Sequence, residues 1–190
     1  MTAAARGLLA VVSGPSGVGK TTVVARLLAK PGYARSITAT TRPVRAGEKD
    51  GVDYVFLTRE AFLAGVAAGR FLEHAVVHGN LYGTPRDAVE AVLARGEVCL
   101  LNVDVQGAEA LRRSGLPVVT VFLLPPSMAE LERRLGGRKT ETPAEVARRL
   151  EIARREMAEA DRFEMRVENR DLDDTVSRIE GFLEARRRSA

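Results

Sequence analysis

The chain has almost no cysteine, no tryptophan and few aromatic residues. Cys99 is the single cysteine among 190 residues, so the sequence can build neither an internal disulfide nor a metal site made of several cysteines. Aromatic residues make up 5% of the chain, which leaves few rings for stacking nucleic-acid bases despite a net charge of +4. Apolar runs are too short for a membrane span, and the first one is too short for a secretory signal. We therefore expect a cytoplasmic protein without a nucleic-acid or membrane partner.

Apolar and charged residues are balanced as in a globular protein, at 45% and 28% of the chain. The length allows one domain with a substantial core. Apolar runs at 8–12, 98–103 and 117–124 have the character of fully buried strands, and helical spacing lies between and after them. These patterns predict an α/β fold with a central parallel sheet flanked by helices. Cys99 falls inside one of the runs and is expected to be a buried, inert thiol.

Capping signals mark the starts of several helices. Thr84 and Pro85 predict a helix in which Thr84 is the cap and Pro85 lies in the first turn. Two capping boxes, Ser127 with Glu130 and Thr142 with Glu145, predict helices over about 127–135 and 143–160, with Arg133 and Arg134 on an exposed face of the first. The polar, glycine-led segment between these two helices is interpreted as a mobile lid.

The region from about 35 to 97 differs from the rest of the chain in the pattern of its charged and apolar residues. It has a charged loop and short strand-like pieces at 54–57 and 71–77, and we interpret it as an insert that carries a second ligand. His74 and His78 have the spacing of a helical metal pair. Because their segment has the pattern of strand and loop, with no further ligand set, we expect no zinc site there.

A glycine-rich segment joins the first apolar run to a helix-like run. It consists of Gly14, Pro15, Ser16, Gly17, Val18, Gly19, Lys20 and Thr21, and Thr22 opens the helix-like run. This G-x-x-x-x-G-K-[ST] order lets backbone N–H groups surround phosphate oxygens, because glycine permits the necessary dihedrals and the helix N-terminus adds positive charge. We expect Lys20 to reach the β- and γ-phosphates of a nucleoside triphosphate and the Thr21 hydroxyl to ligate Mg²⁺. The alternative is a turn that matches by chance.

Further motifs follow in an order that resembles the guanylate kinase family. They are the segments 40–48, 51–56, 71–74, 79–84, 102–107, 137–141 and 149–150, spread over nearly the whole chain. The resemblance implies a P-loop NTPase core (about 1–34, 98–135 and 150–190), a small GMP-binding insert (about 35–97) and an ATP lid (about 136–149). It also implies transfer of the γ-phosphoryl group of ATP to GMP, and by extension to dGMP, with Mg²⁺ as the cofactor.

Guanine recognition is the role that this resemblance assigns to Glu73 and Thr84. Guanine has two neighbouring donors, N1–H and the N2 amine, which one ionised carboxylate can accept, and an acceptor, O6, which a hydroxyl can serve. Adenine would place a lone pair against that carboxylate, so the pair selects guanine. The resemblance adds Ser36 on the base side and Asp104 near the base amine or the lid arginines. Without it, Glu73 could be a surface carboxylate, Thr84 a helix cap and Ser36 a strand-end serine.

Binding of the GMP phosphate is assigned by the resemblance to Arg42 and Arg45, with hydroxyl contacts from Tyr54 and Tyr82. Planar guanidinium groups bind phosphate oxygens in bidentate fashion, which suits this task. The alternatives are plain solvation for the two arginines and packing for the two tyrosines.

Catalysis of phosphoryl transfer needs positioning and charge neutralisation, so no general base or covalent nucleophile is required. The resemblance assigns this task to Lys20, Arg138 and Arg149. Arg138 also belongs to the ATP-binding set, together with Asn169 on the adenine side. Arg148 competes with Arg149 for its role, and Asn169 could instead be an ordinary turn residue.

Asn102 departs from the family pattern. Relatives often carry an aspartate at this position, two residues before Asp104. Any role of that carboxylate in charge balance or Mg²⁺ hydration is therefore in doubt, whereas Asp104 is retained.

Two rival functions stay open. The first is a non-catalytic module of the guanylate kinase type that binds protein partners, but such modules usually have a degraded phosphate loop. The second is a kinase of similar fold acting on another phosphate ester, such as a phosphorylated ribose, which would not need Glu73 and Thr84.

Overall fold

A five-stranded parallel sheet forms the centre of the molecule. The computed structural model describes residues 7–77, 79–136 and 143–189. The strand order is β2-β7-β1-β8-β9, and every neighbouring pair is parallel. The strands are β1 (Leu8–Ser13), β2 (Tyr33–Ala34), β7 (Val98–Asn102), β8 (Val118–Leu124) and β9 (Met165–Glu168). The predicted α/β fold with a central parallel sheet is confirmed.

Helices cover both faces of this sheet, because its strands are apolar on both sides. Leu8, Ala10 and Val12 of β1 pack with helices α1 (Lys20–Leu28) and α7 (Leu172–Ser189). Leu9 and Val11 point the other way, toward α3 (Arg86–Ala94), α4 (Val105–Arg112) and the short 3₁₀ helix η1 (Ala160–Arg162). Each fully buried leucine or valine contributes about 1.5–3 kcal/mol, so these two layers supply much of the stability. Cys99 lies in the second layer, and burial raises the pKa of its thiol to about 11.

A second, smaller sheet has a core of its own. Its order is β4-β3-β6-β5, and its elements are β3 (Ala39–Thr40), β4 (Val55–Phe56), β5 (Phe71–Val77), β6 (Asn80–Pro85) and the adjoining helix α2 (Arg59–Ala67). Phe62 is fully buried and stacks on Phe71 with ring centroids 4.4 Å apart. Position 83 leaves no room for a side chain, because a Cβ on Gly83 would lie 2.9 Å from Phe62 Cζ.

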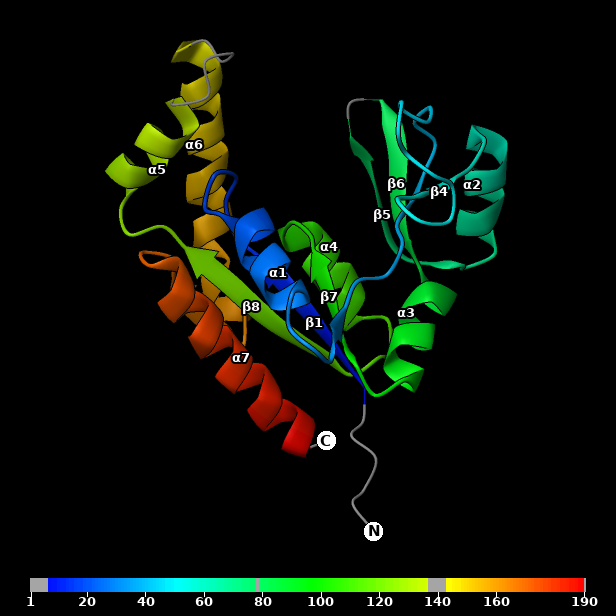
Figure 1. The fold of residues 1–190 in the computed structure, drawn as a ribbon. Coiled ribbons are helices and arrows are strands. Elements are labelled where there is room, and N and C mark those ends of the chain that lie inside the picture. The colour runs from blue at the N-terminus through cyan, green and yellow to red at the C-terminus, as the bar shows by residue number, and fades with distance from the viewer. Residues whose placement is uncertain (1–6, 78, 137–142, 190) are drawn as a thin grey trace.

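Helices α5 (Met128–Gly136) and α6 (Pro143–Ala158) form a separate pair. Figure 1 shows them on the opposite side of the parallel sheet from the second sheet and α2. Leu131 and Leu135 of α5 pack against Leu150 and Ala153 of α6. The predicted cap of α5 is confirmed, since the Glu130 N–H donates to Ser127 Oγ at 3.1 Å. The Thr142 cap and the predicted lid segment between the helices lie outside the described residues.

The predicted start of α3 is wrong. Thr84 is still part of strand β6, and the cap is Pro85, whose backbone is extended with φ −63° and ψ 134°. Pairing of Pro85 with Phe71 in β5 holds this backbone extended, so the helix begins at Arg86. The Thr84 hydroxyl instead donates to Glu73 Oε1 of the neighbouring strand at 2.6 Å.

Helices long and apolar enough to cross a membrane do not occur in residues 7–77, 79–136 and 143–189.

Candidate active site

The glycine-rich segment forms a tight loop at the carboxyl edge of the parallel sheet. Gly14, Gly17 and Gly19 have φ angles of 138°, 84° and 105°, which side chains rarely tolerate. A Cβ on Gly19 would lie 2.5 Å from Asn169 Nδ2, and one on Gly14 would lie 2.5 Å from the Leu123 carbonyl oxygen. Gly19 also caps α1 without a side-chain hydrogen bond, which leaves the first-turn N–H groups to a ligand. The loop therefore has the geometry of an anion-binding helix N-terminus.

Lys20 is the first residue of α1 and folds back over the loop. Its ammonium group donates to the carbonyl oxygens of Gly14 and Pro15, the second at 3.1 Å. Burial lowers the pKa of Lys20, whereas the nearby carboxylates of Glu156 and Asp104 act in the opposite direction. The Lys20 ammonium group is thus held next to the loop by two backbone carbonyl oxygens, which phosphate oxygens could replace as its hydrogen-bond acceptors.

A cavity of about 590 Å³ opens on this loop. Of the predicted triphosphate residues, Ser16, Gly17, Gly19, Lys20, Thr21, Thr22 and Asn169 border it. Asn169 is buried, and its Nδ2 donates to the Val18 carbonyl at 2.8 Å, so it is more than a turn residue. Gly14, Pro15 and Val18 shape the loop without bordering the cavity.

Arg134 was not expected here, and the prediction that it decorates an exposed helix face is wrong. Its guanidinium donates to the carbonyl oxygens of Val18 and Asn169, each at 3.3 Å, and it borders the cavity. The cause is the packing of α5 on the loop, where a Cβ on Gly17 would lie 2.8 Å from Leu135 Cδ2. Arg133 has a side chain 76% exposed and pairs with Glu130, as expected of a helix face.

A second cavity, of about 740 Å³, meets the first at Thr21, which borders both. It lies between the parallel sheet and the second sheet. The predicted base and phosphate residues that border it are Ser36, Tyr54, Glu73, Tyr82, Thr84 and Asp104. Arg35, Asp53 and Asn102 border it as well and were not predicted to do so.

Glu73 and Thr84 are directly opposite each other on the antiparallel strands β5 and β6. The Thr84 hydroxyl donates to Glu73 Oε1 at 2.6 Å, and burial raises the pKa of Glu73. Ser36 is buried at another wall of the same cavity, beside Cys99. The pair offers a carboxylate and a hydroxyl side by side to a planar ligand that has both donors and an acceptor on one edge.

Arg42 lies with Tyr54 and Tyr82, whereas Arg45 does not. The Arg42 guanidinium binds Glu48 Oε1 and the Pro43 carbonyl, each at 2.7 Å, and lies 5.4 Å from the centre of the Tyr54 ring. A hydrogen bond from Arg42 holds the pKa of Glu48 below its ordinary value. The side chain of Arg45 is exposed, and its backbone N–H donates to Glu48 Oε2 at 2.8 Å. Glu48, which the sequence reasoning missed, organises this charged loop.

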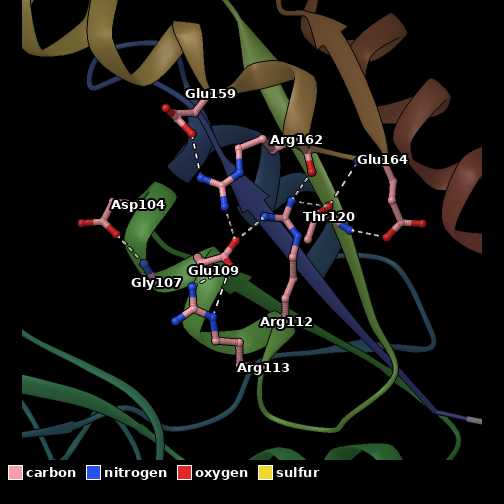
Figure 2. A network of polar contacts seen from close by, with 9 residues as sticks. All are labelled: Asp104, Gly107, Glu109, Arg112, Arg113, Thr120, Glu159, Arg162 and Glu164. Atoms are coloured by element: carbon pink, nitrogen blue, oxygen red, sulfur yellow. Dashed lines mark hydrogen bonds and ion pairs between the residues drawn. The ribbon is translucent and has the colours of Figure 1, made fainter.

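Asp104 has a structural task besides its place at the cavity. Its Oδ1 accepts the Gly107 N–H at 2.8 Å and so caps helix α4 (Figure 2). The carboxylate is thereby fixed at the point where the strand β7 gives way to the helix. Its charge acts on both Lys20 and Glu73.

Arg149, not Arg148, reaches the phosphate loop. Its Nη2 donates to Ser16 Oγ at 2.6 Å, whereas Arg148 is exposed on α6. Arg138 lies outside the described residues.

The residues around Thr21 suit a magnesium ion. Asn102 Nδ2 donates to the Thr21 hydroxyl at 3.5 Å, so the amide nitrogen of Asn102 faces Thr21, and the Thr21 hydroxyl is the oxygen offered to a metal at the junction of the cavities. Groups of three or more His, Cys, Asp or Glu able to hold a metal are absent from the described part of the chain. In a phosphate loop of this pattern the Ser or Thr hydroxyl ligates Mg²⁺ together with substrate phosphates, and this is the role that Thr21 can fill.

Comparison with known proteins matches this arrangement to one family. Residues 6–186 match the family described as guanylate kinase. Guanylate kinase of Symbiobacterium thermophilum is 46% identical over 181 residues, which are 95% of this chain and 86% of that protein. Guanylate kinase of a Synechococcus species is 48% identical over 179 residues, which are 94% of this chain and 96% of that protein.

Solved structures agree. The crystal structure of guanylate kinase from Anaplasma phagocytophilum superposes with a TM-score of 0.72 at 35% identity, over 96% of this chain and 87% of that one. The SH3-kinase fragment of tight junction protein 3 shares the fold alone, with a TM-score of 0.51 at 12% identity over 96% of this chain and 58% of the fragment. The chain belongs to the guanylate kinase family.

Proposed function

We propose that this protein transfers the γ-phosphoryl group of ATP to GMP, yielding ADP and GDP, and accepts dGMP in the same way. The observation that carries the proposal is the junction of the two cavities at Thr21. One cavity is built on a phosphate-binding loop and the other holds a carboxylate paired with a hydroxyl. A donor triphosphate and an acceptor monophosphate can therefore meet within one site.

ATP occupies the first cavity in this proposal. The loop from Gly14 to Thr21, with Thr22, surrounds the triphosphate through backbone N–H groups. Asn169 and the unexpected Arg134 lie on the adenine side, where Arg134 holds the backbone of Val18 and Asn169. Arg138 is assigned to the triphosphate from the sequence motif alone.

GMP occupies the second cavity, with its base against Glu73. The ionised carboxylate accepts N1–H and the N2 amine, while the Thr84 hydroxyl turns from Glu73 toward O6. Ser36 and Asp104 complete the base side. Because burial already disfavours the charge on Glu73, two donors from guanine stabilise it far more than water or adenine can.

The GMP phosphate binds to Arg42, Tyr54 and Tyr82, which already lie together. Arg42 presents its guanidinium over an aromatic ring and beside the Tyr82 hydroxyl. Arg45 joins by turning its exposed side chain inward, and Glu48 fixes the backbone from which it turns. Two guanidinium groups then neutralise the acceptor phosphate.

Catalysis follows from positioning and charge. Lys20 leaves the carbonyl oxygens of Gly14 and Pro15 for the β- and γ-phosphates, and Arg149 moves from Ser16 Oγ to the transferring group, with Arg138 as its partner. Thr21 would hold Mg²⁺ through its hydroxyl, and the bound ion would neutralise phosphate charge. The attacking atom is an oxygen of the GMP phosphate, which is already ionised, so no general base is needed.

The three functional parts are a core, an insert and a lid, within the limits predicted from the sequence. The insert comprises the second sheet and α2 with their separate apolar core. The lid lies around 136–149 and joins α5 to α6. A cytoplasmic location stays a prediction from the sequence.

A panel of nucleoside monophosphates tests the proposal. The purified chain with ATP and Mg²⁺ should produce ADP with GMP and dGMP, and far less with AMP, CMP, UMP or ribose 5-phosphate, in an ADP-coupled assay. Turnover of AMP or a sugar phosphate without GMP would refute it. Binding of GMP without turnover would instead support a non-catalytic module.

A further inference from the structure

The carboxylate of Glu130 is used differently from what its position in helix α5 suggests. The Glu130 N–H donates to the cap residue Ser127, so Glu130 is the third residue of the helix. A glutamate at this position typically reaches back to the backbone N–H of the cap residue. Here the Glu130 carboxylate accepts hydrogen bonds from the guanidinium groups of Arg133 and Arg134. The carboxylate therefore organises the arginines of the helix.

Arg134 is bound through all three of its guanidinium nitrogens. Its Nε donates to Glu130 Oε1 at 2.8 Å, whereas Nη1 and Nη2 donate to the carbonyl oxygens of Val18 and Asn169 at 3.3 Å each. Hydrogen bonds between charged groups are about twice as strong as neutral ones, and N–H···O bonds are usually no longer than about 3.2 Å. The bond to Glu130 is therefore the strongest of the three, and it fixes the direction of the guanidinium group.

Arg133 shares the carboxylate but lies on the outside of the helix. It donates to both oxygens of Glu130, at 2.8 and 2.7 Å, with a side chain that is 76% exposed. The side chain of Arg134 is only 27% exposed, so solvent and salt screen its pair with Glu130 less. Hydrogen bonds from Arg133 and Arg134 lower the pKa of Glu130 to about 2, so the carboxylate stays ionised at any pH suitable for an assay.

Arg134 joins two walls of the first cavity. One wall is the phosphate loop, whose Val18 carbonyl oxygen accepts from both Arg134 and Asn169 Nδ2. The other is the segment after β9, where the Asn169 carbonyl oxygen accepts from Arg134. Arg134 and Asn169 border the cavity, but Glu130 borders neither nucleotide cavity. Any effect of Glu130 on ATP must therefore pass through Arg134.

We propose that Glu130 is a positioning residue for ATP, which orients the Arg134 guanidinium group so that it holds the phosphate loop and Asn169 together around the nucleotide. The proposal deepens the ATP site proposed above and rests on it. Glu130 itself touches no substrate in this arrangement.

Three variants of α5 test this role. Glu130→Ala removes the acceptor and its charge, Glu130→Gln keeps the shape and one acceptor but loses the charge, and Glu132→Gln removes an exposed carboxylate of the same helix as a control. We expect the dissociation constant of ATP with Mg²⁺, measured by calorimetry, to rise about fivefold in the alanine variant and about threefold in the glutamine variant. The control should bind ATP like the parent, and KM for GMP should stay within about twofold in all three.

A double-mutant cycle separates positioning from a general effect on the helix. If Glu130 acts through Arg134, adding Glu130→Ala to Arg134→Ala should weaken ATP binding by less than about 1.5-fold. If Glu130 merely supports α5, its replacement should weaken binding by the same factor in both backgrounds. Equal factors in the two backgrounds, an equal rise in KM for ATP and GMP, or ATP binding by Glu130→Ala within about 1.5-fold of the parent would overturn the proposal.

The cycle does not require turnover of GMP. If the parent chain bound ATP but failed to phosphorylate GMP, the proposed function would be refuted, and the four dissociation constants would still decide the role of Glu130. A parent chain that did not bind ATP would overturn both proposals.

Discussion

Replacing Glu73 by glutamine should separate activity from stability. The two side chains have nearly the same shape, and the amide oxygen can still accept the Thr84 hydroxyl that now donates to Glu73 Oε1 at 2.6 Å. What changes is the chemistry presented to guanine. A carboxylate accepts two donors, whereas an amide accepts on one side and presents N–H groups on the other.

The expected cost to GMP turnover is large. One charge-assisted hydrogen bond is lost, worth about 1.5–3 kcal/mol, and a buried donor is left facing another donor, at a further cost of about 1–3 kcal/mol. Allowing for partial relaxation, we expect a loss of about 3–4 kcal/mol, or roughly 10²- to 10³-fold in kcat/KM for GMP. ATP is proposed to bind in the other cavity, so its dissociation constant should be unchanged.

The effect on stability has the opposite sign. Burial raises the pKa of Glu73, so the folded state holds its proton at pH values where the unfolded chain has lost it. Stability conferred by this carboxyl therefore decreases as pH rises from about 4 through the folded-state pKa, and the cost persists above it. Glutamine carries no such cost. Its melting temperature should match the parent protein at acid pH and exceed it near neutrality.

Steady-state kinetics with GMP, calorimetry with ATP and thermal unfolding across pH measure these three quantities. Glu60→Gln, an exposed carboxylate of α2 in the same part of the chain, is the matched control for activity. Full activity of Glu73→Gln with GMP would refute base recognition by this residue. A melting temperature of Glu73→Gln below that of the parent protein at neutral pH would refute the inference that the buried, ionised Glu73 carboxylate destabilises the fold.

Three further changes probe the ATP side. Lys20→Ala should abolish phosphoryl transfer while circular dichroism stays that of the parent, and measurable turnover would remove Lys20 from the mechanism. Gly19→Ala should lower stability by about 1–2 kcal/mol, because φ is 105° and the new Cβ would lie 2.5 Å from Asn169 Nδ2, and should weaken ATP binding in calorimetry. Arg134→Ala should raise KM for ATP about tenfold without changing KM for GMP, whereas Arg133→Ala, its exposed neighbour on α5, should change neither. Equal effects of the two arginine variants would contradict the proposed contact.

Local patterns were enough to predict the core of the fold. The apolar runs that became β1, β7 and β8 are buried on both faces, so their composition alone indicates parallel strands. The phosphate loop was also predictable, because its glycines, lysine and threonine are consecutive and lie between the strand and the helix that they join. In both cases the information is contained within one short segment.

Contacts between distant segments could not be predicted in this way. Arg134 and Val18 are 116 positions apart. Arg134 lies nearer than exposed Arg133 to the apolar face of α5, but the helical pattern does not show which segment that face meets. Glu48 was missed for the same reason, since it matters only through Arg42 and the Arg45 backbone, to which it is bound. For Thr84 the local pattern was misleading. A threonine before a proline favours a helix cap, but pairing with strand β5 keeps Thr84 in strand β6.

The proposed guanine-binding pair, Glu73 and Thr84, depends on a register shift that no sequence pattern revealed. Phe71 pairs with Pro85, yet Glu73 pairs with Thr84, so the register shifts by one residue between Phe71 and Glu73. Continuing the first register unchanged would put Leu72 opposite Thr84, and a slip of one residue turns every following side chain to the other face of the sheet. With the shift, Leu72 is buried against the core while Glu73 borders the cavity. In the proposed function, base selection thus depends as much on the backbone irregularity between the two strands as on the carboxylate itself.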